Sequence, residues 1–365
     1  MSLRETSIVA PGVLAGSEKM SGFSTVQPLV SICISAYNVE RFLSEALNSI
    51  LGQTYRTTEI ILVDNGSSDR TFEVAQSFHD ARFRCFRIPE NIGGYQAMNK
   101  VANMAKGELI AVYHSDDVYE PNIVEKEVAF LTSHPEAGAV FAMTHFIDED
   151  GRLYGGLNVP PELAGKELLH YEDVFPYTLR HGCTVFVCPA FMVWRRVFAE
   201  VGPFQPERFD IASDLEMWLR LIRRYPVGIL NERLMRYRRS PSQWSQRWRR
   251  LRTESDREFD VMDDYLEKDG WPDKLRPADL IEYRFRRCDD HTTRAANLVI
   301  LGDTGRAREL LRGRYPFRTL LNGIRRRKLR VLLLRGIMKG ALGLGFVRIL
   351  ARLLIQTEYR GRIPS

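Results

Sequence analysis

The sequence predicts an α/β fold, with a mostly parallel β-sheet and helices on both of its faces. In the first half of the chain, strand-length apolar runs alternate with helix-length segments, an order typical of parallel strands joined by helices. The apolar runs are continuous rather than alternating, which favours strands buried on both faces. The length of 365 residues allows one large domain, or a core with an appendage.

The expected strands are rich in Val, Ile and Phe, and they are residues 29–34, 60–63, 83–88, 109–113 and 139–146. The segments between them have helical length, and they are residues 41–52, 71–79, 95–106 and 122–134. Each strand is therefore followed by a helix, as a doubly covered sheet requires.

The pattern changes from about residue 151. An irregular stretch precedes a segment at 184–194 that is expected to be buried, and residues 213–223 have apolar side chains at helical spacing. From about residue 248 the chain is expected to be mainly helical, with 295–312 as half of a helical hairpin. Residues 1–27 have no sustained apolar stretch, so we expect a flexible lead-in rather than a signal peptide.

Charge is distributed unevenly. Between Leu310 and Thr357 there are 12 Lys or Arg and no Asp or Glu, and subtracting them from the net charge of +6 leaves −6 for the remainder. Basic charge confined to one segment does not indicate a general nucleic-acid surface. The five cysteines are few and odd in number, and Cys33 and Cys85 lie in apolar runs, so a reducing, cytoplasmic compartment is expected.

The basic tail has two interpretations. Residues 328–356 mix aliphatic and basic side chains and lack a charge-free span long enough to cross a bilayer. They could form an interfacial helix on an anionic membrane face, starting at a cluster of Arg325, Arg326, Arg327, Lys328 and Arg330. They could equally form helices that pack on the core, with Arg stems covering apolar surface.

Polar residues follow three of the expected strands, where ligands bind in open α/β sheets. Residues 35–38 follow the first strand, Asp64 to Asp69 the second, and His114 to Asp117 the fourth. No glycine-rich phosphate loop follows the first strand, which argues against a dinucleotide-binding or a P-loop protein. Each acidic group is also consistent with a simple turn or a helix start.

These positions nevertheless suit one kind of ligand. A carboxylate after the second strand can accept hydrogen bonds from a ribose or a base. The Asp116-Asp117 pair after the fourth strand suits Mg²⁺ or Mn²⁺, which proteins hold with one or two carboxylates plus substrate phosphates. Such an ion would neutralise a departing diphosphate, the leaving group of a nucleotide-sugar.

The segments 30–38, 59–71, 91–94, 107–110 and 115–117 resemble, in order and spacing, the opening of the family 2 inverting glycosyltransferases. The resemblance covers roughly residues 28–245, and 59–71 is its most specific part. It implies a GT-A type, Rossmann-like domain at 28–250. The nucleotide-sugar half would be 28–150 and the acceptor half 151–250, and a helical region would follow at 251–365.

The resemblance also implies roles for individual residues. The positions implied to bind the nucleotide-sugar are Ser35, Tyr37, Asp64, Asn91, Gly93, Asn99, Ser115 and Asp117. Among these, Ser35 and Tyr37 would line the base pocket and Asp64 would bond the base. Asp116 would hold a Mn²⁺ or Mg²⁺ ion, and His114, which stands where relatives often have an acid, is a further candidate ligand.

The segment 213–220 resembles the helix that carries the family's catalytic base, which makes Asp214 the candidate and Asp210 the reserve. The carboxylate would take the acceptor's proton as its oxygen attacks the anomeric carbon. From the residues alone, Ser213 and Glu216 are equally consistent with a capping box, with Asp214 in the first turn.

Several questions stay open at this stage. Ser240 replaces a histidine of many relatives, and Arg238 and Arg239 are candidates for neutralising phosphate instead. UDP is the expected nucleotide, with dTDP and GDP as alternatives, and the expected acceptor is a glycan or a lipid-linked intermediate. A non-catalytic nucleotide-sugar binding protein and a nucleotidyltransferase are the rival functions. The expected location is the cytoplasm, or the inner face of the cell membrane.

Overall fold

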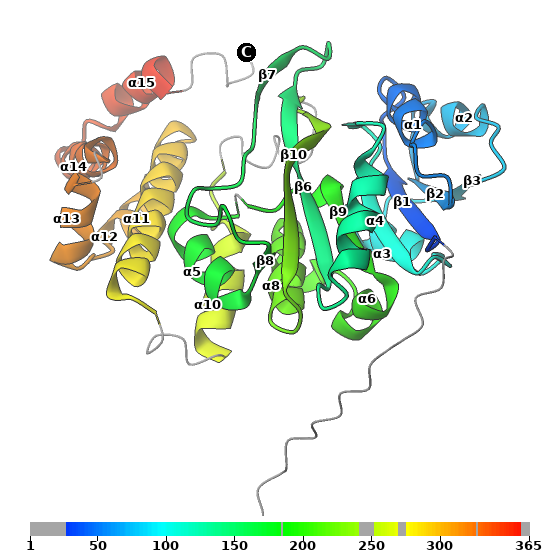
Figure 1. Ribbon diagram of the computed structural model, residues 1–365. Coiled ribbons are helices and arrows are strands. Elements are labelled where there is room, and N and C mark those ends of the chain that lie inside the picture. The colour runs from blue at the N-terminus through cyan, green and yellow to red at the C-terminus, as the bar shows by residue number, and fades with distance from the viewer. Residues whose placement is uncertain (1–26, 184, 241–251, 269–274, 326–327, 359–365) are drawn as a thin grey trace, which may run out of the picture.

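The computed structural model describes residues 27–183, 185–240, 252–268, 275–325 and 328–358. The expected lead-in, apart from its last residue, lies outside these ranges, as do Arg326 and Arg327 of the basic cluster. In the described part, a sheet with helices on both faces occupies one end of the molecule and a group of C-terminal helices the other (Figure 1).

The sheet has the strand order β3-β2-β1-β4-β9-β6-β10-β5. These strands are β1 (Val30–Ala36), β2 (Thr58–Asn65), β3 (Phe83–Ile88), β4 (Leu109–His114), β5 (Val118–Tyr119), β6 (Ala139–Ile147), β9 (Phe191–Trp194) and β10 (Val227–Arg238). Six of them run in one direction, while β9 and β5 run in the other. The mostly parallel sheet is confirmed. Two short strands, β7 (Leu153–Gly156) and β8 (Leu168–Leu169), pair with β6 and β10.

Two apolar cores explain why the strands are continuously apolar. Ile32 and Ile60 face one core, to which α1 (Leu43–Leu51) and α4 (Ile123–Ser133) contribute their buried sides. Cys33 faces the other core. The helices on that second face are α3 (Gly94–Ala102), α5 (Tyr171–His181), α6 (Arg195–Val201) and α8 (Ser213–Ile222). Because successive strand residues point to opposite faces, both sets must be apolar.

The expected strands all form, with ends shifted by at most two residues. The expected helices form too, although α2 (Thr71–Gln76) and α3 end three and four residues before the predicted ends at 79 and 106. The expectation for 295–312 was wrong. This segment is not half of a hairpin, because it holds the end of α11 (Pro277–Ile300), a turn at Gly302 with φ +85°, and α12 (Thr304–Arg312).

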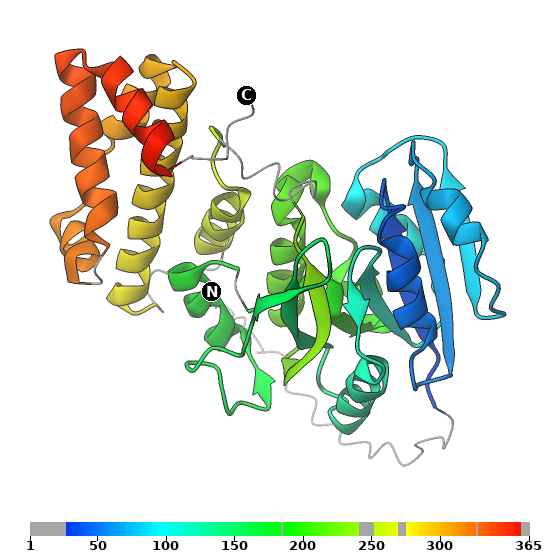
Figure 2. The same cartoon turned by 90° about the horizontal axis from the view of Figure 1, so that it is seen from above.

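The remaining C-terminal helices form the predicted helical extension. They are α10 (Arg257–Lys268), α13 (Phe317–Arg325), α14 (Leu329–Leu344) and α15 (Val347–Glu358). Figure 2 shows α11 to α15 grouped beside the sheet, around a separate apolar core. Arg180 of α5 joins the two parts through an ion pair with Asp279 of α11. Arg286 of α11 donates to the carbonyl of Thr178 at 2.9 Å. Among the described helices, none is both long enough and apolar enough to cross a membrane.

A buried carboxyl group under the sheet provides a test of this packing. Glu127 of α4 is fully buried and accepts a hydrogen bond from the Tyr113 hydroxyl at 3.0 Å. Burial raises its pKa from 4.5 to about 8. The folded protein therefore binds this proton more tightly than the unfolded chain. The free energy of unfolding should fall as pH rises from about 4.5 to about 8.

We expect Glu127→Gln, which cannot ionise, to be more stable than the wild type at about pH 8.5, by roughly 2–4 kcal/mol, and to differ little at about pH 5. Urea unfolding at both pH values measures the difference. The matched control is Glu125→Gln, an exposed residue on the same helix, which should show no such trend. A Glu127→Gln stability difference that is independent of pH would contradict the prediction.

Candidate functional site

The candidate residues lie at the edge of the sheet where β1, β2 and β4 end. The register pairs Ala36 with Asp64 on one side of β1, and Ser35 with His114 on the other. Ser115 continues this edge, and its hydroxyl donates to the carbonyl of Ser35 at 3.0 Å. The ends of β1, β2 and β4 therefore lie at one edge of the sheet.

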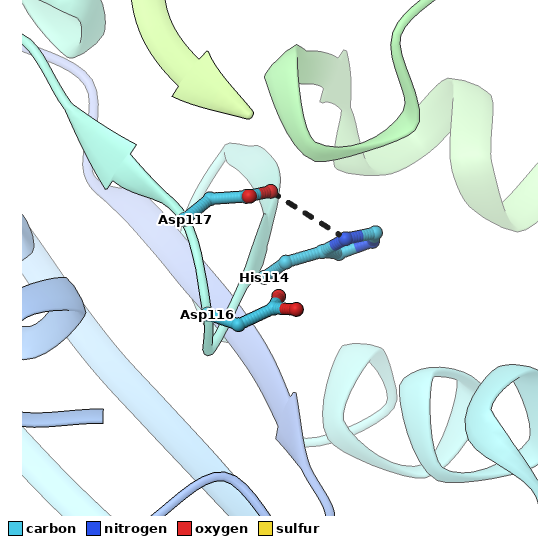
Figure 3. Close-up of side chains that lie close together, drawn as sticks. All are labelled: His114, Asp116 and Asp117. Atoms are coloured by element: carbon cyan, nitrogen blue, oxygen red, sulfur yellow. Dashed lines mark ion pairs between the residues drawn. The ribbon is translucent and has the colours of Figure 1, made fainter. Parts of the chain in front are cut away.

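An acidic cluster follows β4. His114, Asp116 and Asp117 each offer a ligand atom within 4.8 Å of the others, and Figure 3 shows the three side chains gathered on one turn. The His114 Nδ1 lies 3.7 Å from a carboxylate oxygen of Asp117. Asp117 had been expected near the nucleotide-sugar, and the structure places it in the cluster with the two candidate metal ligands.

Asp117 gives this cluster a feature that a bound cation would stabilise. Its side chain is fully buried, and its Oδ2 has no hydrogen-bond partner among the described residues. Burial, and then the charge of Asp116, hold its pKa well above the usual range. A buried carboxylate oxygen without a donor is costly, and a bound cation would remove that cost. An imidazole and two carboxylates are ligands that Mn²⁺ or Mg²⁺ accepts.

Arg238 stabilises the turn that carries the cluster. Its backbone N–H donates to Asp117 Oδ1 at 2.8 Å, and its Nε donates to the carbonyl of Asp116 at 2.9 Å. Its side chain also pairs with Glu45 at 2.5 Å and is only 2% exposed. The idea that Arg238 neutralises phosphate is therefore wrong, because these bonds occupy the guanidinium inside the protein. Arg239 is exposed, and its guanidinium lies 3.7 Å from the centre of the Phe146 ring.

Ser240, which stands where many relatives have a histidine, is buried. Its hydroxyl donates to the Glu149 carboxylate. It therefore contributes to the same supporting layer as Arg238 rather than to the surface of the cluster.

Asp64 forms the second polar feature of this edge. Its side chain is fully buried, and one oxygen lies 3.4 Å from the Ser67 N–H. The other oxygen lies 3.3 Å from Arg87 Nε without a hydrogen bond from any described residue. The next turn requires Gly66, since its φ is +71° and a Cβ there would lie 2.6 Å from the backbone of Glu90.

The Asn91-Gly93 loop is fixed onto the end of β2. The Asn65 amide donates to Asn91 Oδ1 at 3.0 Å and accepts from the Ile92 N–H at 3.0 Å. Asn91 Oδ1 also accepts from the Gly93 N–H at 2.9 Å. Gly93, with φ +90°, leads into α3. Tyr37 lies just beyond the end of β1 and is 44% exposed.

The side chain of Asn99, an expected nucleotide-sugar residue, bonds the backbone of Phe204. It accepts from the Phe204 N–H at 2.9 Å and donates to the Phe204 carbonyl at 2.8 Å. Both ends of the amide are used in fastening α3 to the segment before α8. Asn99 could contact a nucleotide-sugar directly only if these two hydrogen bonds broke.

Asp214 lies in the first turn of α8 and is partly buried. The expected capping box is wrong, because the helix begins at Ser213 and the Ser213 hydroxyl donates to the Asp210 carbonyl at 2.7 Å. Glu216 instead pairs with Arg220 at 2.9 Å. The reserve candidate, Asp210, is exposed and has a φ of +47°.

Two residues connect Asp214 to the rest of the site. The Tyr95 hydroxyl donates to the carbonyl of Ile211 at 3.2 Å and lies close enough to Asp214 to be influenced by its charge. Burial and then the charge of Asp214 raise the Tyr95 pKa well above 10. Burial, followed by the charges of Asp214 and Asp117, raises the pKa of the Cys188 thiol. Asp214 and the acidic cluster therefore border the same region.

Comparison with known proteins agrees with this geometry. The sequence profile of glycosyl transferase family 2 matches residues 31–202. The glycosyltransferase GlyG of Streptococcus pneumoniae is 30% identical over 219 residues, which are 58% of this chain and 71% of GlyG. The chain belongs to glycosyl transferase family 2. An uncharacterised glycosyltransferase of Rickettsia typhi is 32% identical, and the match spans 59% of this chain but 65% of that relative.

The fold of this family 2 protein has solved counterparts. The crystal structure of S. aureus TarS in complex with UDP-GlcNAc superposes with a TM-score of 0.50 at 13% identity, over 82% of this chain and 91% of that one. This likeness confirms the predicted GT-A type fold. Family membership confirms the prediction that the chain is a glycosyltransferase.

The sequence did not indicate that Tyr95 or Cys188 would lie near Asp214. Tyr95 follows two glycines and was expected only as the start of a helix, and Cys188 lies in a segment expected only to be buried. Both come near Asp214 through tertiary packing. The only available signal was that a tyrosine directly after the Asn91-Gly94 loop stands close to the implied donor residues.

Proposed function

We propose that this family 2 member transfers a sugar from a nucleotide-sugar, in the first place a UDP-sugar, to a hydroxyl group of a glycan or a lipid-linked acceptor, with inversion. The observation that carries the proposal is the His114-Asp116-Asp117 cluster, with a buried carboxylate oxygen that no described residue hydrogen-bonds, at the same sheet edge as Asp64. Polysaccharide synthesis for the cell envelope, in the cytoplasm or at the inner membrane face, would be its setting. The nucleotide-sugar half would be 28–150 and the acceptor half 151–250.

The nucleotide would bind beside Asp64. The buried Asp64 oxygen that no described residue hydrogen-bonds offers an acceptor for a base N–H, with Ser35 and Tyr37 along the neighbouring strand end. The fixed loop at Asn91 and Gly93 would border the sugar. TarS, a protein of the same fold, was crystallised with UDP-GlcNAc, which supports a UDP-sugar over the dTDP and GDP alternatives.

Mn²⁺ or Mg²⁺ would be held by Asp116, with His114 and Asp117 as further ligands. Partial burial lowers the pKa of His114, against the opposing effect of Asp116. The neutral imidazole therefore has a lone pair to offer at neutral pH. When bound, the ion supplies positive charge for a departing diphosphate.

Asp214 would act as the general base. As the acceptor oxygen bonds to the anomeric carbon, the bond from that carbon to the diphosphate oxygen breaks and its electrons leave with the diphosphate. The acceptor's proton passes to the Asp214 carboxylate. The acceptor oxygen attacks one face of the anomeric carbon and the diphosphate departs from the opposite face. A single displacement therefore inverts the configuration of that carbon.

Tyr95 would position this base. We expect Tyr95→Phe to lower kcat/KM about tenfold and to shift the acidic limb of its pH profile upward, because a carboxylate in a less polar surrounding holds its proton more tightly. Measuring kcat/KM across pH checks this. Tyr55→Phe, which removes a phenol hydrogen-bonded only to the Pro28 carbonyl among the described residues, is the matched control. An activity loss without a shift of the profile would indicate a merely structural role.

Thermal stability and donor cleavage, measured with UDP-, dTDP- and GDP-sugars with and without Mn²⁺, test the proposed function. A ligand of the folded state stabilises it by about 2.7 kcal/mol at a hundred times its Kd. We expect one UDP-sugar to raise Tm only with metal, and Asp64→Ala to remove this shift. Donor binding without transfer to any glycan or lipid-linked acceptor would favour a binding protein. Absence of any shift would contradict the site itself.

A further inference from the structure

The C-terminal helices expose an unusual amount of apolar surface. Among the described residues, nine of the fourteen large, strongly exposed apolar side chains lie between Phe317 and Leu353. These helices already have their own core, in which Met338 and Leu342 of α14 are buried. The exposed side chains are therefore additional to those that hold the helices together.

On α14 the exposed apolar side chains form a stripe. Leu329, Leu333 and Ile337 follow one another at four-residue spacing and are 47%, 62% and 59% exposed. Leu344, 74% exposed, continues the same face at the end of the helix. Lys339 of the same helix is also exposed. An exposed apolar stripe on a helix that also carries exposed positive charge is the pattern of a helix that lies in a membrane interface.

The next helix repeats the pattern. Ile349 and Leu353 of α15 are 58% and 52% exposed, while Leu350 is buried in the core of the bundle. Arg348 and Arg352 are exposed beside them. Phe346, in the turn before α15, is 56% exposed. Two successive helices thus present aliphatic and aromatic side chains together with positive charge.

The positive charge of this region indicates which partner its exposed apolar surface would bind. No Asp or Glu occurs between Leu310 and Thr357, whereas the rest of the chain carries a net −6. Two basic side chains of the region serve the fold: Arg335 caps the end of α12 by donating to the Leu311 carbonyl at 3.0 Å, and Lys328 pairs with Glu282 at 2.8 Å. A second copy of the chain would bring like charges together. An anionic bilayer would match both the charge and the apolar stripe.

We infer that the exposed faces of α14 and α15 dock on an anionic lipid bilayer, with Leu333, Ile337 and Ile349 entering the headgroup boundary. Repulsion between the acidic body and the lipid would orient the molecule with these helices toward the membrane. In Figure 1, α15 lies toward the end of the molecule at which β6 and β10 end, the edge that carries the candidate site. This placement suits a lipid-linked acceptor, and only that last point rests on the proposed function.

Sedimentation of the full chain with vesicles tests the inference. We expect binding to phosphatidylcholine vesicles that contain phosphatidylglycerol, weak binding to phosphatidylcholine alone, and loss of binding as salt rises. Replacing Lys339, Arg348 and Arg352 together by Gln should weaken binding on the order of a hundredfold, at about one kcal/mol for each cation. Leu333→Gln with Ile337→Gln should remove the binding that survives moderate salt.

The controls use the same kinds of residue elsewhere on the surface. Leu301→Gln removes an apolar side chain that is 57% exposed outside these helices, and Arg152→Gln removes a cation that is 77% exposed. Both should bind vesicles like the wild type. Wild-type protein that ignores anionic vesicles at low salt, equal binding to both lipids, or a stable dimer with this face covered would overturn the inference. The Asp214→Asn variant should bind vesicles like the wild type even where it no longer transfers sugar. Failure of the membrane inference can therefore be told apart from failure of the proposed function.

Discussion

Replacing Asp214 by Asn is expected to lower kcat by about 10²- to 10⁴-fold while donor binding is kept, because an amide cannot take the acceptor's proton. Asn conserves the size of the side chain and the oxygen that accepts from the Leu215 N–H at 2.7 Å. The first turn of α8 should therefore be unchanged. Initial rates of transfer, together with the donor-induced rise in Tm, separate the loss of chemistry from a loss of binding.

Asp210→Asn is the matched control for this prediction. Asp210 lies four residues earlier, is exposed and has a φ of +47° with a ψ of −121°, and Asn keeps the size and branching of the native side chain at this position. We expect its activity to stay within a few-fold of the wild type, an order-of-magnitude statement for a side chain outside the chemical step. If Asp210→Asn were the inactive variant and Asp214→Asn were active, the reserve candidate would be the base.

Replacing Asp116 by Asn is expected to remove metal-dependent donor binding and to lower kcat/KM by about 10³-fold or more, since the diphosphate would leave without compensating charge. Asp116 is the better choice than Asp117, whose fully buried carboxylate also accepts from the Arg238 N–H at 2.8 Å. Removing Asp117 would therefore disturb the turn as well as the cation site. Donor binding and transfer are measured with and without Mn²⁺.

A chelator should have the same effect on the wild type as this substitution, and should add nothing to the variant. Asp150→Asn changes an aspartate that is 57% exposed in the turn after β6, and it should respond to metal like the wild type. Full wild-type activity in excess chelator would contradict a metal-dependent reaction. It would leave His114, Asp116 and Asp117 as a purely structural cluster.

The order and type of the elements could be predicted because their signals are local. Each strand of the first half is a continuous apolar run, and its two faces meet separate cores, so burial alone imposes the pattern on neighbouring residues. The positions of Asp64 and Asp116 at strand ends follow directly from that order. The family resemblance then gave those positions chemical roles.

Element ends were less predictable because backbone hydrogen bonds decide them. The capping box at Ser213 and Glu216 failed for this reason. The Ser213 hydroxyl bonds the Asp210 carbonyl, and Glu216 pairs with Arg220 one turn later. The Ser213 bond depends on the turn at Asp210, whose φ is +47°.

The sequence by itself therefore determined the α/β order, the acidic strand ends and the basic tail, since these depend on neighbouring residues or on composition. Only the tertiary structure decided which polar groups already have hydrogen-bond partners within the protein. Arg238 is 121 residues from Asp117 and yet bonds it, and Asn99 bonds Phe204 across 105 residues. Tyr95 reaches the carbonyl of Ile211 across 116 residues. Such pairings depend on how the sheet brings distant segments together, and buried polar groups must take whichever partner that packing supplies.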